Sequence, residues 1–584
     1  MKSKWKGKNS AIIQNVMNIH NTPPNTALAK MKELALVSVL FLALTLLMTF
    51  PLAAHFSTHL IGNKGDSWQH AWNMWWMNKT LTEHVGSPFQ TDYLFYPKGV
   101  TLAFNDMSFF NSGLSIPLQR MFNLFAAYNT MFLVSFVLSG LGMYLLALYL
   151  TKDKPAAFLA GCIFVFCPYR MGHSLGHLSL VSTQFIPFFA LFFLKSINAE
   201  NRSDMVFAAL FLILTSFCNW YYLVFCTIFV LLYLIFILFT DRSLLAKAAL
   251  KTALIFTGTL IILSPIFFIL LRAALTTQFI GAHDPQIFSA DILSYFIPGA
   301  IQNLGRFKAF ADITSQFTGN TAENSNYIGY SVLLLSAIAF VRLRKKDRLI
   351  TFLTICSAVF LILSLGINPH LKGGVHTSIT LPYKILYDNL FFFKFTGMPA
   401  RFLIMLMFCL SLLSAFGIKA LRLSVPAGHK QKTVFIALLF AVLAEYASLP
   451  YLMTSFPGSP FFETMRQDTE DYGVIYLPHN TPRALYYQTL HNKKMMGGYL
   501  SRTPFSAYHD ILNPALKHLF LYSYPFEAIT DAYSHERTRA LTKTALHDLE
   551  IKFIILENDR ANYFLQSLRI PIFYTDEIIT VYKP

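Results

Sequence analysis

Residues 59–76 carry the combination of side chains that most clearly predicts chemistry. The segment reads HLIGNKGDSWQHAWNMWW, with Asp66 at its centre and His70 four residues later. A carboxylate held among aromatic rings beside a bilayer is partly desolvated, which raises its pKa. Asp66 is therefore predicted to act as a general base for an acceptor hydroxyl, or to ligate a metal ion. His70 is a candidate substrate contact.

The same segment carries four tryptophans at helical spacing. A helix with indole rings on one face typically lies at the headgroup level of a membrane. Simple anchoring at the interface explains such a belt without any catalytic role. Asp92, further along the same loop, is a second acidic candidate for substrate binding. The tryptophans are Trp68, Trp72, Trp75 and Trp76.

His173 and His177 stand four residues apart, which places them on one face of a helix. Zinc ligation with a third ligand from elsewhere, contacts to phosphate or sugar hydroxyls, and plain helix packing all remain open. The HExxH motif is absent because residue 174 is serine.

Arg170 and Arg401 both lie beside apolar runs, where a charged side chain is expensive. The guanidinium fork matches phosphate geometry, so either could hold the phosphate of a lipid-linked donor. Snorkelling to lipid headgroups is the alternative. Arg401 is the stronger candidate, because it follows Pro399 in a loop that re-enters the membrane beside a run of phenylalanines.

Five further polar residues complete the candidate substrate contacts. Glu445 lies inside an apolar run, where a carboxylate is functional by default unless it pairs with a structural arginine. Three others belong to one segment of the tail, YYQTLHNKKMMGGYLSR, which is expected to line the cleft or to lie on the surface. The five are Glu323, Glu445, Gln488, His491 and Arg502.

Composition identifies the environment in which these residues act. Hydrophobic residues make up 54% of the 584 residues and charged residues only 13%, with 57 Phe and 28 Tyr. Soluble domains carry about 25% charged residues. An integral membrane protein is therefore predicted. The net charge of +17 accompanies no nucleic-acid-binding motif and fits lysines and arginines held in cytoplasmic loops.

Apolar runs of spanning length predict about eleven transmembrane helices between residues 34 and 450. Lysine and arginine are several-fold denser in one set of connecting segments than in the other. The positive-inside rule then places the N-terminus, residues 1–33, in the cytoplasm. The large outer loops are 57–128, 274–325 and 367–401, and the tail 451–584 lies on the outer face.

The tail has the composition of a soluble domain. GVIYLP (473–478), KFIILEN (552–558) and EIITVYKP (577–584) predict strands, while PALKHLFLYS and RALTKTALHDLE predict helices. An α/β or α+β extracytoplasmic domain is expected.

An acidic residue in the first outer loop, polytopic helices and an outer tail together resemble the GT-C superfamily of membrane glycosyltransferases. Further segments, among them CPYRMGHSLGHLSLVSTQFIP (167–187) and LPYKILYDNLFFFKFTGMPARF (381–402), resemble a bacterial branch near the YfhO-like proteins. The resemblance implies that Asp66 is the catalytic base or the metal site. A second acid often follows in that family, but here Ser67 follows, so a divalent cation is left open as cofactor.

The resulting hypothesis is sugar transfer from a polyprenyl-phosphate donor to a cell-envelope acceptor. The chain would lie in a bacterial inner membrane, among lipids, and would act on a glycan, lipid or protein acceptor without nucleic acid. A transporter or flippase for a lipid-linked glycan, and a non-catalytic envelope assembly factor, are the alternatives. Repeat symmetry or several charges in mid-span would favour the transporter, and neither is evident.

Overall fold

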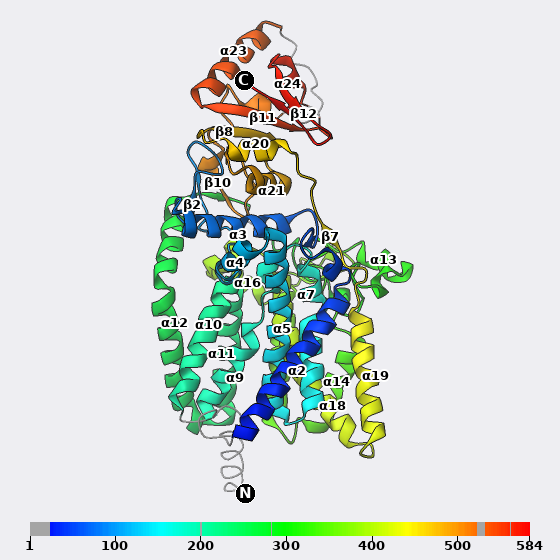
Figure 1. Ribbon diagram of the computed structural model, residues 1–584. Helices are drawn as coiled ribbons and strands as arrows, with labels where there is room; N and C mark the ends of the chain where they lie inside the picture. The colour runs from blue at the N-terminus through cyan, green and yellow to red at the C-terminus, as the bar shows by residue number, and fades with distance from the viewer. Residues whose placement is uncertain (1–23, 199–200, 282, 522–531, 561) are drawn as a thin grey trace.

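The computed structural model describes residues 24–198, 201–281, 283–521, 532–560 and 562–584. Long helices stand side by side in a bundle, and one helix, α3 (Asp66–Glu83), lies across one end of them (Figure 1). Beyond α3 lies a five-stranded sheet formed by the tail. Most of the expected N-terminal segment, residues 1–23, falls outside the described residues.

Among the described residues, seven helical segments are long and apolar enough to cross a membrane. They comprise α2 (Pro24–Met48), α5 (Leu124–Thr151), α6 (Lys154–Phe166) with α7 (Pro168–His173), α8 (Leu178–Val181) with α9 (Phe185–Asn198), α11 (Trp220–Thr240), α12 (Arg242–Thr276) and η4 (Pro399–Phe402) with α18 (Leu403–Leu423).

Four other expected spans also form helices, but they are short or less apolar. Two are apolar helices of fewer than 18 residues, α14 (Tyr330–Leu343) and α15 (Arg348–Ser364). The other two are α10 (Arg202–Cys218) and α19 (His429–Tyr446). The expected count of eleven spans is therefore not confirmed, while the membrane-spanning character of the bundle is.

The bundle is centred on α18, which is buried along nearly its whole length against α6, α14 and α15. At the edge, α12 is mostly exposed and packs mainly against α10 and α11. Local sequence sets several helix ends: Asn219 separates α10 from α11, and its side chain accepts the Tyr221 N–H. Pro168, which cannot continue a helix, marks the break between α6 and α7.

The first loop supplies α3, the short strands β2 (Gln90–Thr91) and β3 (Val100–Thr101), and α4 (Phe109–Met121). The expected tryptophan helix is present, but its expected role as an interface anchor is wrong. Trp68, Trp72 and Trp76 are buried. Trp68 packs on the rings of Phe456 and Tyr486, and Trp72 donates to Gln488, whereas Trp76 packs on Tyr93 of the same loop. Trp68 and Trp72 therefore join the tail to the bundle.

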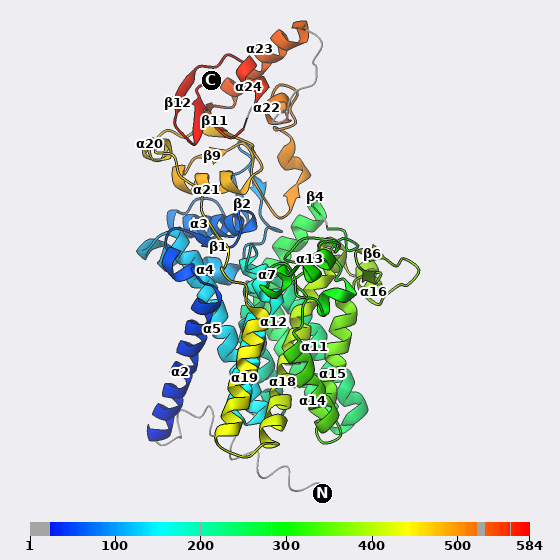
Figure 2. The same cartoon turned by 90° about the vertical axis from the view of Figure 1, so that its right-hand side faces the viewer.

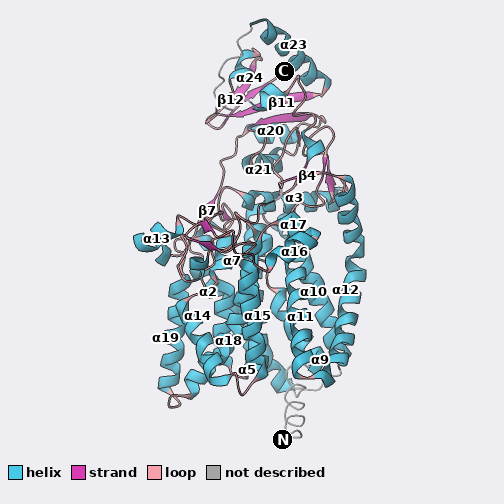
Figure 3. Cartoon of the chain, turned by 180° about the vertical axis from the view of Figure 1, so that it is seen from behind, coloured by secondary structure: helices cyan, strands magenta, loops and turns pink. Residues whose placement is uncertain are grey.

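The tail folds as expected from its strand signals. Its sheet has the order β12-β13-β11-β8-β9, with β8 (Gly473–Leu477) and β11 (Ile551–Glu557) parallel and buried at the centre. β13 (Ile579–Tyr582) pairs antiparallel with both β11 and β12 (Ile572–Thr575), and β9 is Lys494–Met495. The helices are α20 (Phe461–Gln467), α21 (Pro482–His491), α22 (Lys517–Leu521), α23 (Ala532–Asp548) and α24 (Tyr563–Ser567). Figure 3 shows this sheet beyond the helical bundle.

Two strand pairs connect the tail to loops of the bundle. β10 (Thr503–Pro504) pairs with β4 (Phe279–Ile280), and β7 (Met453–Thr454) pairs with β1 (Leu60–Ile61). Figure 2 places α13 (Lys308–Thr314), α16 (Tyr383–Asn389) and β6 (Gly374–Val375) at the same end as α3. The remaining short elements are η1 (Leu52–His55), η2 (Ile292–Tyr295), η3 (Leu304–Arg306), β5 (His370–Leu371), α17 (Phe391–Thr396) and η5 (Phe505–Tyr508).

Candidate active site at the α3 end of the bundle

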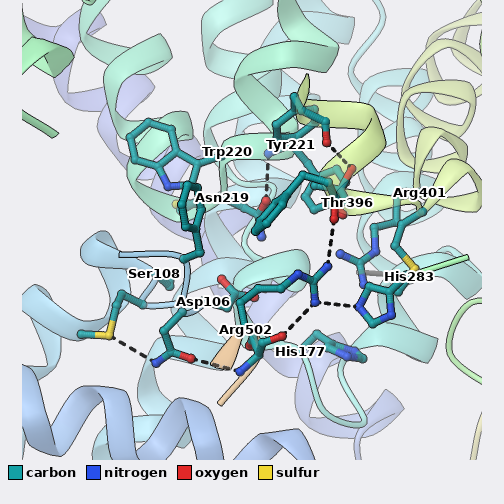
Figure 4. A pocket seen from close by; sticks show the side chains of 18 of the residues that line it. Asp106, Ser108, His177, Asn219, Trp220, Tyr221, His283, Thr396, Arg401 and Arg502 are labelled. Carbon is teal, nitrogen blue, oxygen red and sulfur yellow. Dashed lines mark hydrogen bonds between the residues drawn. The ribbon is translucent and has the colours of Figure 1, made fainter. Parts of the chain in front are cut away.

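A cavity of about 420 Å³ opens between the bundle, the first loop and the tail. Its polar wall is built from loops and helix ends, and Figure 4 shows several of these side chains pointing toward one another. The rest of the wall is apolar and comes largely from α11, α12 and α17. The charged or titratable side chains on the wall are Asp66, His70, Asp106, His177, Cys218, Tyr221, His283, Glu323, Arg401, Tyr499 and Arg502.

Asp66 is the first residue of α3, where a negative charge is favoured by the helix dipole. Its Oδ1 accepts from the Tyr499 hydroxyl at 2.6 Å, and its Oδ2 lies 3.0 Å from Nε2 of His177. Burial raises the pKa of Asp66, but these two hydrogen bonds outweigh it and hold the pKa below its ordinary value. The expected raised pKa is therefore wrong, and Asp66 is a stable carboxylate.

The two expected histidines, His173 and His177, extend the side-chain contacts from Asp66 into the protein interior. α7 ends at His173, and His177 lies beyond it in the turn before α8, so the two do not share a helix face as expected. They are nevertheless in contact, with their Nδ1 atoms 3.5 Å apart. Only His177 reaches the cavity wall.

Glu323 and Arg401 close the buried side of this network. Nε and Nη2 of Arg401 both donate to Oε1 of Glu323, at 2.9 and 2.8 Å. Oε2 of Glu323 lies 3.9 Å from Nε2 of His173. The Arg401 guanidinium also stacks 4.8 Å above the Tyr221 ring. Arg401 is thus positioned on the cavity wall by a buried carboxylate and an aromatic ring.

Arg502 enters the cavity from the tail. Its guanidinium lies 3.1 Å from Nε2 of His283 and 5.3 Å from the centroid of the Phe395 ring. Burial, followed by the charge of Arg502, lowers the pKa of His283 to about 4. His283 is therefore neutral at physiological pH and can accept an N–H of Arg502. No carboxylate pairs with Arg502 in the described part of the chain, so its charge is available to a ligand.

His70 and Asp106 form the wall nearest α4. Nε2 of His70 lies 3.8 Å from Oδ2 of Asp106, an oxygen that accepts the Ser179 hydroxyl at 2.5 Å. Burial, more than any other cause, lowers the pKa of His70. His70 is therefore a neutral imidazole at this wall, as suits a contact to a sugar hydroxyl.

Two expected site residues are held by structural partners inside the bundle. Arg170 donates to the carbonyls of Val165 and Val181 and to the Ser135 hydroxyl, at 3.0–3.3 Å. Glu445 accepts from the backbone N–H and hydroxyl of Ser331. Neither lies on the cavity wall, and both brace helices.

Three others lie in or beside the tail, away from the cavity. Asp92 pairs with Lys494 at 3.1 Å. Gln488 accepts from Trp72 Nε1 at 2.7 Å and donates to two backbone carbonyls. His491 is buried and accepts a backbone N–H through its Nδ1. The expected cleft segment does reach the site, but through its end, where Tyr499 and Arg502 lie.

Tyr499, Asp106 and His283 are cavity residues to which sequence reasoning assigned no role. Tyr499 stands within the tail segment that was expected to line the cleft, so its position was indicated although its identity was not. Asp106 and His283 lie in loops without a motif, and no local signal marks them.

The described residues contain no group of three or more histidines, cysteines, aspartates or glutamates arranged to hold a metal ion. Both Asp66 oxygens already accept hydrogen bonds from the protein. The described side chains do not by themselves provide a metal site.

Solved structures with the same arrangement define the class of fold. The oligosaccharyltransferase of Archaeoglobus fulgidus in its apo form matches with a TM-score of 0.50 and 14% identity, over 90% of this chain and 69% of that chain. Arabinofuranosyltransferase AftD from Mycobacteria matches with a TM-score of 0.57 and 13% identity, over 94% of this chain but only 41% of that one. A weaker likeness, at a TM-score of 0.47 and 11% identity, is to ArnT from Cupriavidus metallidurans, over 93% of this chain and 97% of that one.

The chain therefore shares the fold of the oligosaccharyltransferase and of AftD. By sequence, the chain belongs to the family described as Domain of unknown function (DUF6311), whose profile matches residues 35–444. No curated protein sequence matches it significantly. The expected nearness to the YfhO-like proteins is not confirmed.

Proposed function

We propose that this protein is a membrane glycosyltransferase that transfers a sugar from a polyprenyl-phosphate donor to an acceptor hydroxyl. The observation that carries the proposal is one cavity with three kinds of wall. A carboxylate, Asp66, and two arginines, Arg401 and Arg502, line the same cavity as an apolar surface. Two proteins that share the fold, an oligosaccharyltransferase and an arabinofuranosyltransferase, are named for sugar transfer, which adds support.

The two arginines suit the donor's phosphate. Arg502 has a free charge, and Arg401 is oriented by Glu323. Guanidinium groups bind phosphate oxygens through paired hydrogen bonds. The apolar wall, with Phe267 and Leu270 from α12 and Leu223 from α11, suits the isoprenoid chain. Since the outer side of α12 is exposed, the isoprenoid chain would extend from the cavity into lipid along that helix.

In the proposed reaction, the acceptor oxygen attacks the anomeric carbon while the bond from that carbon to the phosphate oxygen breaks. The phosphate leaves with the bonding electron pair, and Arg502 and Arg401 offset its charge. Attack opposite the leaving group inverts the anomeric carbon. The acceptor proton becomes acidic as the new bond forms, so a carboxylate of lowered pKa suffices to orient the hydroxyl and take the proton late.

The membrane setting is part of the proposal. Lysine and arginine gather in the loops at the end of the bundle remote from α3, which supports a cytoplasmic location for that end. The cavity and the tail, residues 451–584, would then face the outside of a bacterial inner membrane. The acceptor would be a cell-envelope glycan, lipid or protein.

The test uses purified protein in lipid, a panel of polyprenyl-phosphate sugars and envelope acceptors, and measures released polyprenyl phosphate. Asp66→Asn keeps the shape and is expected to slow release by about 10²–10⁴-fold. Asp471→Asn, at a carboxylate whose side chain is 77% exposed, is the matched control. Equal rates in wild type and Asp66→Asn would reject Asp66 as the base. An arm with EDTA asks whether a divalent cation is needed, and we expect release to continue.

A further inference from the structure

A short strap of the tail, residues 497–504, forms part of the cavity wall through Tyr499, Leu500, Ser501 and Arg502. The strap is held at both ends: the Phe95 N–H donates to the carbonyl of Gly497 at 3.0 Å, and β10 pairs with β4. In its middle, the Ser501 hydroxyl donates to Gln69 of α3 at 3.1 Å. The strap backbone is thus fixed over the site.

Tyr499 projects from this strap to Asp66. Its hydroxyl donates to Oδ1 of Asp66 at 2.6 Å, while His177 occupies the other carboxylate oxygen. Burial, together with the charge of Asp66, raises the pKa of Tyr499, so the phenol keeps its proton and remains a donor. An alcohol-type hydroxyl is therefore already bound to the proposed base when no substrate is present.

The two partners of Asp66 differ in how firmly they are held. His177 is fixed between Asp66 and the buried His173. The half-buried ring of Tyr499 follows Gly497 and Gly498, and its hydroxyl bond to Asp66 is the only one that the structure gives that group. Rotation of one side chain would release Asp66 Oδ1 without moving the strap backbone.

We propose that the Tyr499 hydroxyl occupies the position of the acceptor hydroxyl and guards Asp66 until an acceptor displaces it. This inference rests on the proposed function. Its consequence is that water is kept from Asp66 while a donor waits, so the donor is not hydrolysed. An acceptor must supply a hydroxyl that replaces the phenol, which makes Tyr499 a residue that selects acceptors.

Tyr499→Phe removes the hydroxyl and keeps the ring. We expect acceptor-independent release of polyprenyl phosphate to rise about fivefold or more, and the acceptor KM to fall, while kcat with acceptor is maintained. The rise must vanish in the double variant Tyr499→Phe/Asp66→Asn. Tyr508→Phe, at a ring that packs on Phe95 in the following turn, is the control. A fall of release to the Asp66→Asn level, or no change, overturns the proposal.

A second readout tests the contact without turnover. With 3-nitrotyrosine placed at position 499, the phenol absorbance is expected to titrate about one pH unit or more above that of the unfolded protein. Asp66→Asn should reduce this shift and leave the part that comes from burial. If the nitrotyrosine at position 499 titrates at the same pH with and without Asp66→Asn, that result alone overturns the inference. If the pKa shift at position 499 is found as expected but the wild type releases polyprenyl phosphate from no donor, the proposed function is overturned. The proposed guard role of Tyr499 is then overturned with it.

Discussion

Nε2 of His177 lies 3.0 Å from Oδ2 of Asp66, so the turn after α7 is joined to the first turn of α3. Behind this contact, His173 and then Glu323 lead to Arg401. The two Nδ1 atoms can share a hydrogen bond only if one carries a proton and the other does not. A proton on Nδ1 of His173, donated to Nδ1 of His177, leaves the Nε2–H of His177 for Asp66.

Replacing His177 should move the pH dependence of the reaction. Hydrogen bonds from His177 and Tyr499 hold the pKa of Asp66 down against burial, so His177→Ala should raise it. The reaction needs the carboxylate, and the acid limb of kcat/KM should therefore shift upward by about one pH unit or more. In the wild type, the stability that ionised Asp66 contributes is present above the ordinary aspartate pKa and is lost as pH falls.

The control for this profile is His547→Gln, at a side chain that is 92% exposed. This variant should leave the acid and the basic limb of the kcat/KM profile at their wild-type pH values. If His177→Ala lowers kcat at every pH and leaves the acid limb unmoved, His177 does not set the ionisation of Asp66.

Breaking the Arg401–Glu323 pair should destabilise the protein. Arg401→Leu leaves the carboxylate of Glu323, whose side chain is 2% exposed, buried without its cation. Such a loss costs about 3–5 kcal/mol, because the remaining charge is desolvated and unpaired. Denaturant unfolding in detergent measures it, with Arg466→Leu, at a 63% exposed side chain, as control.

The double variant Arg401→Leu/Glu323→Gln separates the two parts of this cost. It should be more stable than Arg401→Leu, because no buried charge is left unpaired. Equal stability of the double and single variants would contradict an ion pair that is buried in the folded protein.

Arg502 should contribute to donor affinity. Arg502→Gln removes the free charge at the cavity wall, and a hydrogen bond to a charged group is worth about 1.5–3 kcal/mol. Binding of polyprenyl phosphate, measured by ligand titration, should weaken about tenfold to a hundredfold. Arg560→Gln, an exposed arginine of the tail, should not change it. Unchanged binding in Arg502→Gln would assign the phosphate to Arg401 alone.

Gln488 should matter for stability rather than for substrate binding. Its side chain joins Trp72 of α3 to Tyr93 and Lys493. Gln488→Leu leaves the buried Trp72 N–H without its acceptor, at a cost of about 1–3 kcal/mol. Thermal unfolding should shift to lower temperature, while the KM for donor stays within about twofold of wild type. A large rise in KM at unchanged stability would return Gln488 to the substrate site.

Local sequence determined much of the secondary structure. Apolar runs of spanning length became the helices of the bundle, and β-rich runs at 473–478, 552–558 and 577–584 became the main strands of the tail. Asp66 was singled out as the first acidic residue among aromatics, and it begins α3 and lies on the cavity wall. These properties depend on residues near one another in the chain, so a sequence reveals them.

Contacts between distant residues decided the rest. Tyr499 and Asp66 are 433 residues apart, and the tail must fold over α3 before they meet. The same covering buries tryptophans that would otherwise face lipid headgroups. Arg170 looks like a phosphate ligand until carbonyls from a neighbouring turn surround its guanidinium. By itself, the sequence determined a polytopic helical protein with Asp66 as the candidate base, because hydropathy and residue type are local. Which side chains share the cavity, and the ionisation of Asp66, were decided only by tertiary structure, because burial and hydrogen-bond partners come from packing.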